Sequence, residues 1–252
     1  EYYDAIFKWQ ESHNGVTGLT KENIGYENGV LGGVASALSV LCSKGDNVLV
    51  HSPTYVGFTG TLTNNGYHIV HSALKLDEQG IWRMDFEDME KKIVDNNIKV
   101  AVICNPHNPT GRVWTREELA KAMALFEKYG VYVISDEIWA DLTLNGNKQI
   151  PTQSVSEYAR EHTVALYAPS KTFNLAGLAV TNVIIQDEAL REKMGPARPM
   201  LSPFGITACI AAYTQCDDWV DELNEYLDEE IDYVVNRFHE ELPKVKVWKP
   251  EG

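Results

Sequence analysis

The chain has 252 residues, which is enough for one large domain or two small domains with a substantial core. Hydrophobic residues make up 44% and charged residues 23%, as in ordinary globular proteins, and no apolar run approaches the ~20 residues that span a bilayer. The net charge of −14 argues against a nucleic-acid partner, because phosphate backbones are bound by Lys and Arg.

The cysteines of the chain predict neither disulfides nor a metal site. None belongs to a C-x-x-C pair, and all lie in apolar or helical contexts. Reduced structural thiols are the simpler interpretation, so we expect a cytoplasmic protein. The four cysteines are Cys42, Cys104, Cys209 and Cys216.

The N-terminal part opens with an amphipathic pattern over 3–13, which predicts a helix closed by Asn14-Gly15. A glycine-rich turn at 28–33 then leads into a helix of small and apolar residues that ends near Cys42. Free backbone N–H groups at such a helix start can bind an anion, and glycine permits close approach. A tightly packed buried helix explains the pattern equally well, and the dinucleotide pattern G-x-G-x-x-G is absent.

Short apolar runs alternate with helical patterns through the middle of the chain. The helical patterns cover 55–64, 85–95 and 115–129. Such alternation predicts crossover units and a mostly parallel sheet with helices on both faces, which is a three-layer α/β/α sandwich. The runs that we expect to be strands are 47–51, 68–71, 99–104, 131–134, 164–167 and 180–185.

Polar residues follow the ends of several of these runs. Tyr55 follows the first run, Asn108 the third, Asp136 the fourth and Lys171 the fifth. Ligands of parallel sheets bind beyond the carboxyl ends of the strands, so we expect these four residues to converge at one edge. Burial of Lys171 there would lower its pKa and make its amine nucleophilic. For the pair Ser170-Lys171 taken alone, a surface lysine at a strand exit is the plainer alternative.

The C-terminal part is predicted to be helical. One helix opens at Leu201-Ser-Pro203 and runs to about Thr214, and a long helix starts at Asp217 and is ended by Pro243. Its acidic residues indicate a solvated face. Its apolar stripe consists of Trp219, Leu223, Leu227, Ile231, Val234 and Phe238.

Three motifs in this order resemble the aminotransferase class I/II family of fold type I pyridoxal-phosphate (PLP) enzymes. They are Asn105-Pro-His-Asn-Pro-Thr-Gly111, Ser135-Asp-Glu-Ile138 and Ser170-Lys171. The resemblance covers essentially the whole chain and looks most like the MalY/PatB-type cystathionine β-lyase branch. It implies the large domain of a fold type I transferase, with 1–241 as the PLP-binding domain and 242–252 as the start of a smaller C-terminal domain.

The resemblance assigns roles that are also chemically reasonable. Lys171 is expected to hold PLP as a Schiff base and, once the substrate displaces it, to remove the Cα proton. Asp136 is expected to pair with the pyridinium nitrogen, so that the ring accepts electrons. A strand-end cap is the alternative for Asp136. Asn108 would donate to the phenolic oxygen of the ring, from an Asn-Pro turn whose bond to Pro109 we expect to be cis.

Further residues complete the cofactor site that the resemblance implies. Tyr55 would stack on one face of the ring while Ile138 presses on the other, although plain core packing also explains Tyr55. Backbone N–H groups of Leu31 and Gly32, together with the Ser170 hydroxyl, would bind the phosphate.

The chain departs from the family pattern at two positions. Ala168 stands where the family commonly has Ser or Thr, and Ala179 stands where many members have an arginine that binds the phosphate. The lyase branch also tends to lack that arginine. Relatives begin upstream of Glu1, and they extend past Gly252 into a small domain whose arginine binds the substrate carboxylate.

The resemblance implies a PLP enzyme that acts on amino acids as a homodimer. The leading expectation is a C–S β-lyase that converts cystathionine-like substrates to a thiol, pyruvate and ammonia by α,β-elimination. An aminotransferase with a 2-oxo acid acceptor would use the same residues, and pyruvate release without an acceptor separates the two. An alternative of another class is the PLP-binding sensor domain of a transcription regulator, which would carry a helix-turn-helix upstream.

Overall fold

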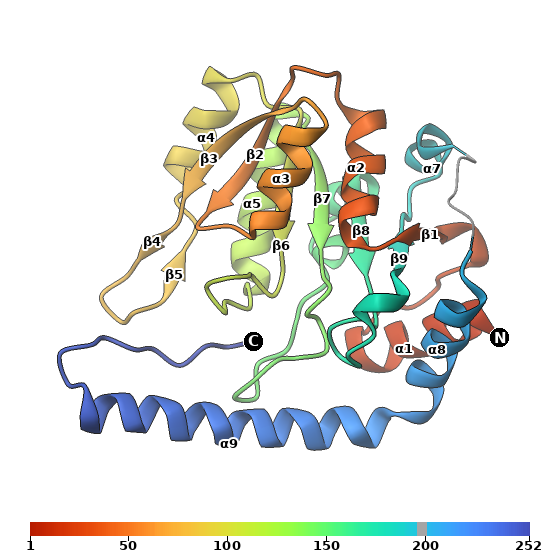
Figure 1. The fold of residues 1–252 in the computed structure, drawn as a ribbon. Coiled ribbons are helices and arrows are strands. Elements are labelled where there is room, and N and C mark those ends of the chain that lie inside the picture. Colours follow the sequence, from red (N-terminus) through yellow and green to blue (C-terminus); the bar gives the residue numbers. More distant parts are fainter. Residues whose placement is uncertain (196–200) are drawn as a thin grey trace.

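The computed structural model describes residues 1–195 and 201–252 and contains a seven-stranded sheet between layers of helices (Figure 1). The strands of this sheet are β1 (Ile24–Asn28), β2 (Asn47–Ser52), β3 (His68–Ala73), β6 (Val100–Cys104), β7 (Tyr132–Asp136), β8 (Thr163–Tyr167) and β9 (Val180–Ile184). Their order is β1-β9-β8-β7-β6-β2-β3. The neighbouring strands β3, β2, β6, β7 and β8 pair in parallel, whereas β9 is antiparallel to both β8 and β1. The predicted mostly parallel sheet is confirmed.

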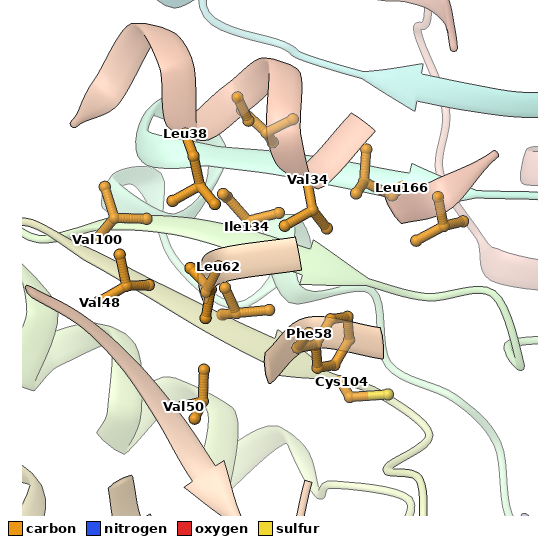
Figure 2. Packing of buried hydrophobic residues seen from close by; sticks show 14 of the residues in the cluster. Val34, Leu38, Val48, Val50, Phe58, Leu62, Val100, Cys104, Ile134 and Leu166 are labelled. Carbon is orange, nitrogen blue, oxygen red and sulfur yellow. The ribbon is translucent and has the colours of Figure 1, made fainter. Parts of the chain in front are cut away.

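Helices cover both faces of the sheet. Successive strand residues point to opposite faces, so the apolar strands have side chains to bury on both faces. The helices are α1 (Tyr2–Asn14), α2 (Val30–Leu41), α3 (Val56–Asn64), α4 (Phe86–Asp95), α5 (Arg116–Tyr129), α6 (Glu157–His162), α7 (Glu188–Met194), α8 (Pro203–Gln215) and α9 (Asp217–Glu241). Val48 and Val50 of β2 pack in the apolar cluster of α2 and α3, whereas Leu49 packs with α4 and α5. Figure 2 shows Val34 and Leu38 of α2 in the first cluster. The three-layer sandwich is therefore confirmed.

The expected strands and helices all lie close to their predicted bounds, but the sequence did not indicate β1. Gly25 is the second residue of this short strand, and a Cβ atom there would lie 3.3 Å from Cβ of Val183 in β9. Glycine therefore permits the close pairing of β1 with β9, and the same glycine weakens the strand pattern. The two-stranded sheet of β4 (Lys75–Leu76) and β5 (Trp82–Arg83) was also not predicted.

The long helix α9 lies along the sheet edge where the chain also ends (Figure 1). Val220 is buried, but Trp219 and Phe238 of the predicted apolar stripe are exposed. The last residues return to the loop after β6, where the Glu251 amide donates to the Gly111 carbonyl at 2.7 Å. Within the described ranges, no helix combines the length and the apolar character that crossing a membrane requires.

Candidate active site

A cavity of about 240 Å³ lies at the edge of the sheet where β6, β7 and β8 end. The structure brings together there the four residues that follow predicted strands, although they lie far apart in the sequence. Gly32 is the one expected site residue that is not part of the cavity lining. The expected residues in the lining are Leu31, Tyr55, Asn108, Asp136, Ile138, Ser170 and Lys171.

Asp136 is a buried carboxyl at the end of β7, with a side chain that faces the cavity. Its Oδ1 accepts a hydrogen bond of 3.1 Å from the Ile138 amide. Burial raises the pKa of the Asp136 carboxyl from 3.8 to about 7, and the Ile138 amide and the charge of Lys171 offset this rise only in part. A cationic N–H group in the cavity would supply the positive partner that stabilises the carboxylate form of Asp136.

Lys171 lies in the turn that follows β8, and its Nζ is 5.1 Å from the centre of the Trp139 ring. The side chain is exposed, whereas the sequence suggested a buried lysine. Trp139 also lines the cavity, and the sequence analysis gave it no role. The only signal for Trp139 was its place directly after the Asp136 motif.

Tyr55 precedes α3 and lies against the first turn of that helix. Its ring packs edge-on against Phe58, with the two ring centres 5.5 Å apart. Gly57 leaves the space for this arrangement, because a Cβ atom there would lie 2.3 Å from Cε1 of Tyr55. The absence of a side chain at Gly57 thus allows the Tyr55 ring to fold back over α3 at the cavity wall.

The N-terminus of α2 supplies free backbone donors to the same cavity. The helix starts after Gly29, which has φ of 82° and offers no side chain to cap the first N–H groups. Such an N-terminus attracts anions, because its unpaired amides and the helix dipole both present positive charge. Asn108 lies on another wall, and its peptide bond to Pro109 is cis, as expected.

Glu137 is a second buried carboxyl beside Asp136, and its burial was not predicted from the sequence. Its oxygens accept hydrogen bonds from the Ser135 hydroxyl at 2.8 Å, from the Thr152 amide at 3.0 Å, and from the side chains of Gln149 and Tyr167. Burial raises the pKa of Glu137, whereas these donors lower it. Glu137 is not part of the cavity lining and instead fixes the segment that carries Asp136.

The described lining fits PLP in three respects. The Asp136 carboxylate matches a protonated ring nitrogen, the uncapped start of α2 matches a phosphate, and the Lys171 amine matches an aldehyde. Ala179 also lines the cavity, so the position that carries arginine in many family members contributes no cation to the site. Lining residues that the sequence analysis did not assign are Asn28, Gly29, Val30, Cys104, Trp139, Ala176, Ala179 and Val180.

Comparisons with known proteins agree with this fit. The family model described as aminotransferase class I and II matches residues 1–252. The chain is 38% identical to cystathionine β-lyase PatB of Bacillus subtilis and 30% identical to the MalY protein of Escherichia coli, covering 99% and 100% of this chain. The PLP-bound C–S lyase of Staphylococcus hominis superposes on 99% of this chain with a TM-score of 0.94 and 33% identity. The chain spans about 65% of the length of each of these three proteins.

Proposed function

The chain belongs to the aminotransferase class I and II family, and we propose that its full-length protein is a PLP-dependent C–S β-lyase. The reaction is the cleavage of the Cβ–S bond of cystathionine-like amino acids, with the uptake of one water, to a thiol, pyruvate and ammonia. The observation that carries the proposal is that Lys171 and the buried Asp136 line the same cavity. The names of the relatives above favour the lyase over other reactions of the family.

The residues of the cavity divide the work of this reaction. When bound, PLP supplies an electron sink that stabilises negative charge at the substrate Cα. The Lys171 amine holds the cofactor in the resting enzyme, removes the Cα proton of the bound substrate and can return a proton to the departing sulfur. Asp136 keeps the ring nitrogen protonated, because burial raises the pKa of this carboxyl and a positive charge beside it stabilises its carboxylate form.

The other predicted residues orient and anchor the cofactor in this proposal. Asn108 would donate a hydrogen bond to the phenolic oxygen of PLP, and Tyr55 and Ile138 would hold the ring from its two faces. The amides of Leu31 and Gly32 bind the phosphate at the start of α2. The Ser170 hydroxyl, next to Lys171 in the sequence, donates to the same phosphate.

An aminotransferase with a 2-oxo acid acceptor remains the second candidate, and the description of the family supports it. The two functions differ in what they require. A lyase releases pyruvate from cystathionine with PLP alone, whereas an aminotransferase needs 2-oxoglutarate or another acceptor. The proposal predicts steady pyruvate formation by the full-length protein without an acceptor. Turnover that depends on 2-oxoglutarate would overturn the lyase assignment in favour of the transaminase.

We also propose that residues 1–241 form the PLP-binding domain, that 242–252 begin a smaller domain, and that the enzyme is a cytoplasmic homodimer. All four cysteines are free thiols, which suits a reducing compartment. Val56 and Phe204 expose 75% and 81% of their surface, and large exposed apolar side chains suit a subunit contact. Light scattering of the full-length protein tests the dimer, and a mass of one subunit would contradict it.

A further inference from the structure

The turn 169–175 carries Lys171, and it lies outside the hydrogen-bonded sheet. Within the turn, the Phe173 amide donates to the Pro169 carbonyl at 3.0 Å, and the Leu175 amide donates to the Ser170 carbonyl at 2.9 Å. These bonds shape the turn but do not attach it to the rest of the molecule. Thr172, directly after Lys171, is buried with 1% of its surface exposed.

The Thr172 side chain provides a polar attachment for the turn. Its hydroxyl donates to Oδ2 of Asp141 at 2.8 Å. The other carboxylate oxygen, Oδ1, accepts from Nε1 of Trp9 in α1 at 2.9 Å. The main-chain carbonyl of Asp141 accepts from Nδ2 of Asn224 in α9 at 2.9 Å. Because both of its carboxylate oxygens have donors, Asp141 is held in one orientation.

Asp141 belongs to the segment that directly follows Asp136, the last residue of β7, and this segment also supplies Trp139 to the cavity. This segment is compact, since the Ala140 amide donates to the Glu137 carbonyl at 3.0 Å. It therefore contacts the lysine turn twice, through the Trp139 ring near Lys171 and through the Asp141 carboxylate at Thr172. The two contacts link the turn that carries Lys171 to the segment that follows Asp136.

Phe173 adds apolar contacts, with its ring centre 5.6 Å from that of Trp9 and 5.7 Å from that of Trp219. Such contacts hold the turn against the core, but they tolerate sliding. A hydrogen bond is directional and is lost over a small displacement. The bond between Thr172 and Asp141 is therefore the contact best suited to fix where the Lys171 amine points.

We propose that Asp141 is a positioning residue, which through Thr172 fixes the Lys171 turn in register with Asp136. The inference rests on the proposed use of Lys171 and Asp136 with PLP. Asp141 does not line the cavity, so it acts on the reacting atoms only through its neighbours. Its effect follows from the sensitivity of catalysis to small misplacements of a catalytic group.

The test uses the full-length protein with Thr172→Val, which removes the hydroxyl, and Thr172→Ser, which keeps it. The matched control is Thr163→Val, because Thr163 is equally buried and its hydroxyl has no hydrogen-bond partner among the described residues. Three measurements are made. They are amide exchange over 169–175 without PLP, the pH titration of the visible absorption of bound PLP, and kcat and KM separately.

Thr172→Val should speed amide exchange in 169–175, shift the pH titration of the absorption and lower kcat by roughly tenfold with KM nearly unchanged. Thr172→Ser and Thr163→Val should resemble the wild type. Asp141→Ala should reproduce the loss, and adding Thr172→Val to it should cost little more, since both changes break the same hydrogen bond between Thr172 and Asp141. If Asp141→Ala does not fold, the Thr172 series alone decides.

Two outcomes would overturn the inference while leaving the proposed function intact. In the first, Thr172→Val behaves like Thr163→Val in all three measurements. In the second, exchange accelerates but the titration and kcat do not change, which would make the contact purely structural. A wild-type protein that binds no PLP would instead overturn the proposed function, and this inference would fall with it.

Discussion

Asp136→Asn should make the cofactor-free protein more stable while weakening its binding of PLP. Burial raises the pKa of Asp136 from 3.8 in the unfolded chain to about 7 in the folded protein. At pH values between these two, the folded protein binds a proton that the unfolded chain has already released. The carboxylate therefore costs no stability below pH 3.8, and its cost grows until about pH 7. At about 1.4 kcal/mol per pH unit, the charged carboxylate lowers the free energy of unfolding by about 4 kcal/mol at pH 8, where the cost is complete, and by about 2 kcal/mol at pH 5.

Asparagine is neutral, and its amide oxygen can still accept the hydrogen bond from Ile138, so the variant avoids this cost. Urea unfolding of cofactor-free wild type and variant, at pH 8 and at pH 5, measures the difference. The control is Asp77→Asn, because the hydrogen bond from the Ile81 amide lowers the pKa of the Asp77 carboxyl. The charged Asp77 therefore stabilises the folded protein at pH values above the ordinary pKa of aspartate. The control should therefore lose stability at pH 8. Equal stability of wild type and Asp136→Asn at pH 8 would refute the reasoning.

Two further predictions concern the cavity wall and the core. Gly57→Ala should displace the Tyr55 ring and weaken PLP binding roughly fivefold, as expected for the loss of an aromatic contact of about 1 kcal/mol. The control is Gly60→Ala, which should not weaken binding because the space around Gly60 is open. Fluorescence titration with PLP checks both. Burial lowers the pKa of His51 from 6.5 to about 4, so the contribution of His51 to stability should fall by about 2 kcal/mol between pH 7 and pH 5. His51→Leu removes this contribution, so the stability of the variant relative to the wild type should rise by about 2 kcal/mol from pH 7 to pH 5 in urea unfolding.

The layered fold and the place of the site were predictable because their signals are local. Most strands of the parallel part contain a short apolar run, and polar residues such as Asn108 or Asp136 lie at or after the ends of several of them. Parallel strands bring their carboxyl ends to one edge, so the convergence of these residues follows from the topology. The antiparallel strand β1 escaped prediction, since Gly25 both enables its pairing and interrupts its apolar pattern.

The environment of the site was not predictable, because it depends on distant partners. Glu137 is buried among donors that include Gln149, Thr152 and Tyr167, and no local pattern reveals that grouping. The sequence also suggested a buried, activated lysine, whereas Lys171 is exposed in the turn after β8. That error arose because strand patterns indicate where a strand ends but not how the following turn folds.

The most direct test of the account is to locate the lysine that carries PLP. The full-length protein is incubated with PLP, reduced with borohydride, digested and analysed by peptide mass. The account predicts that the pyridoxyl group is on Lys171, and that Lys171→Ala loses both the adduct and pyruvate formation from cystathionine. An adduct on another lysine, or none in the wild type, would contradict the pairing of Lys171 with Asp136 at one cofactor.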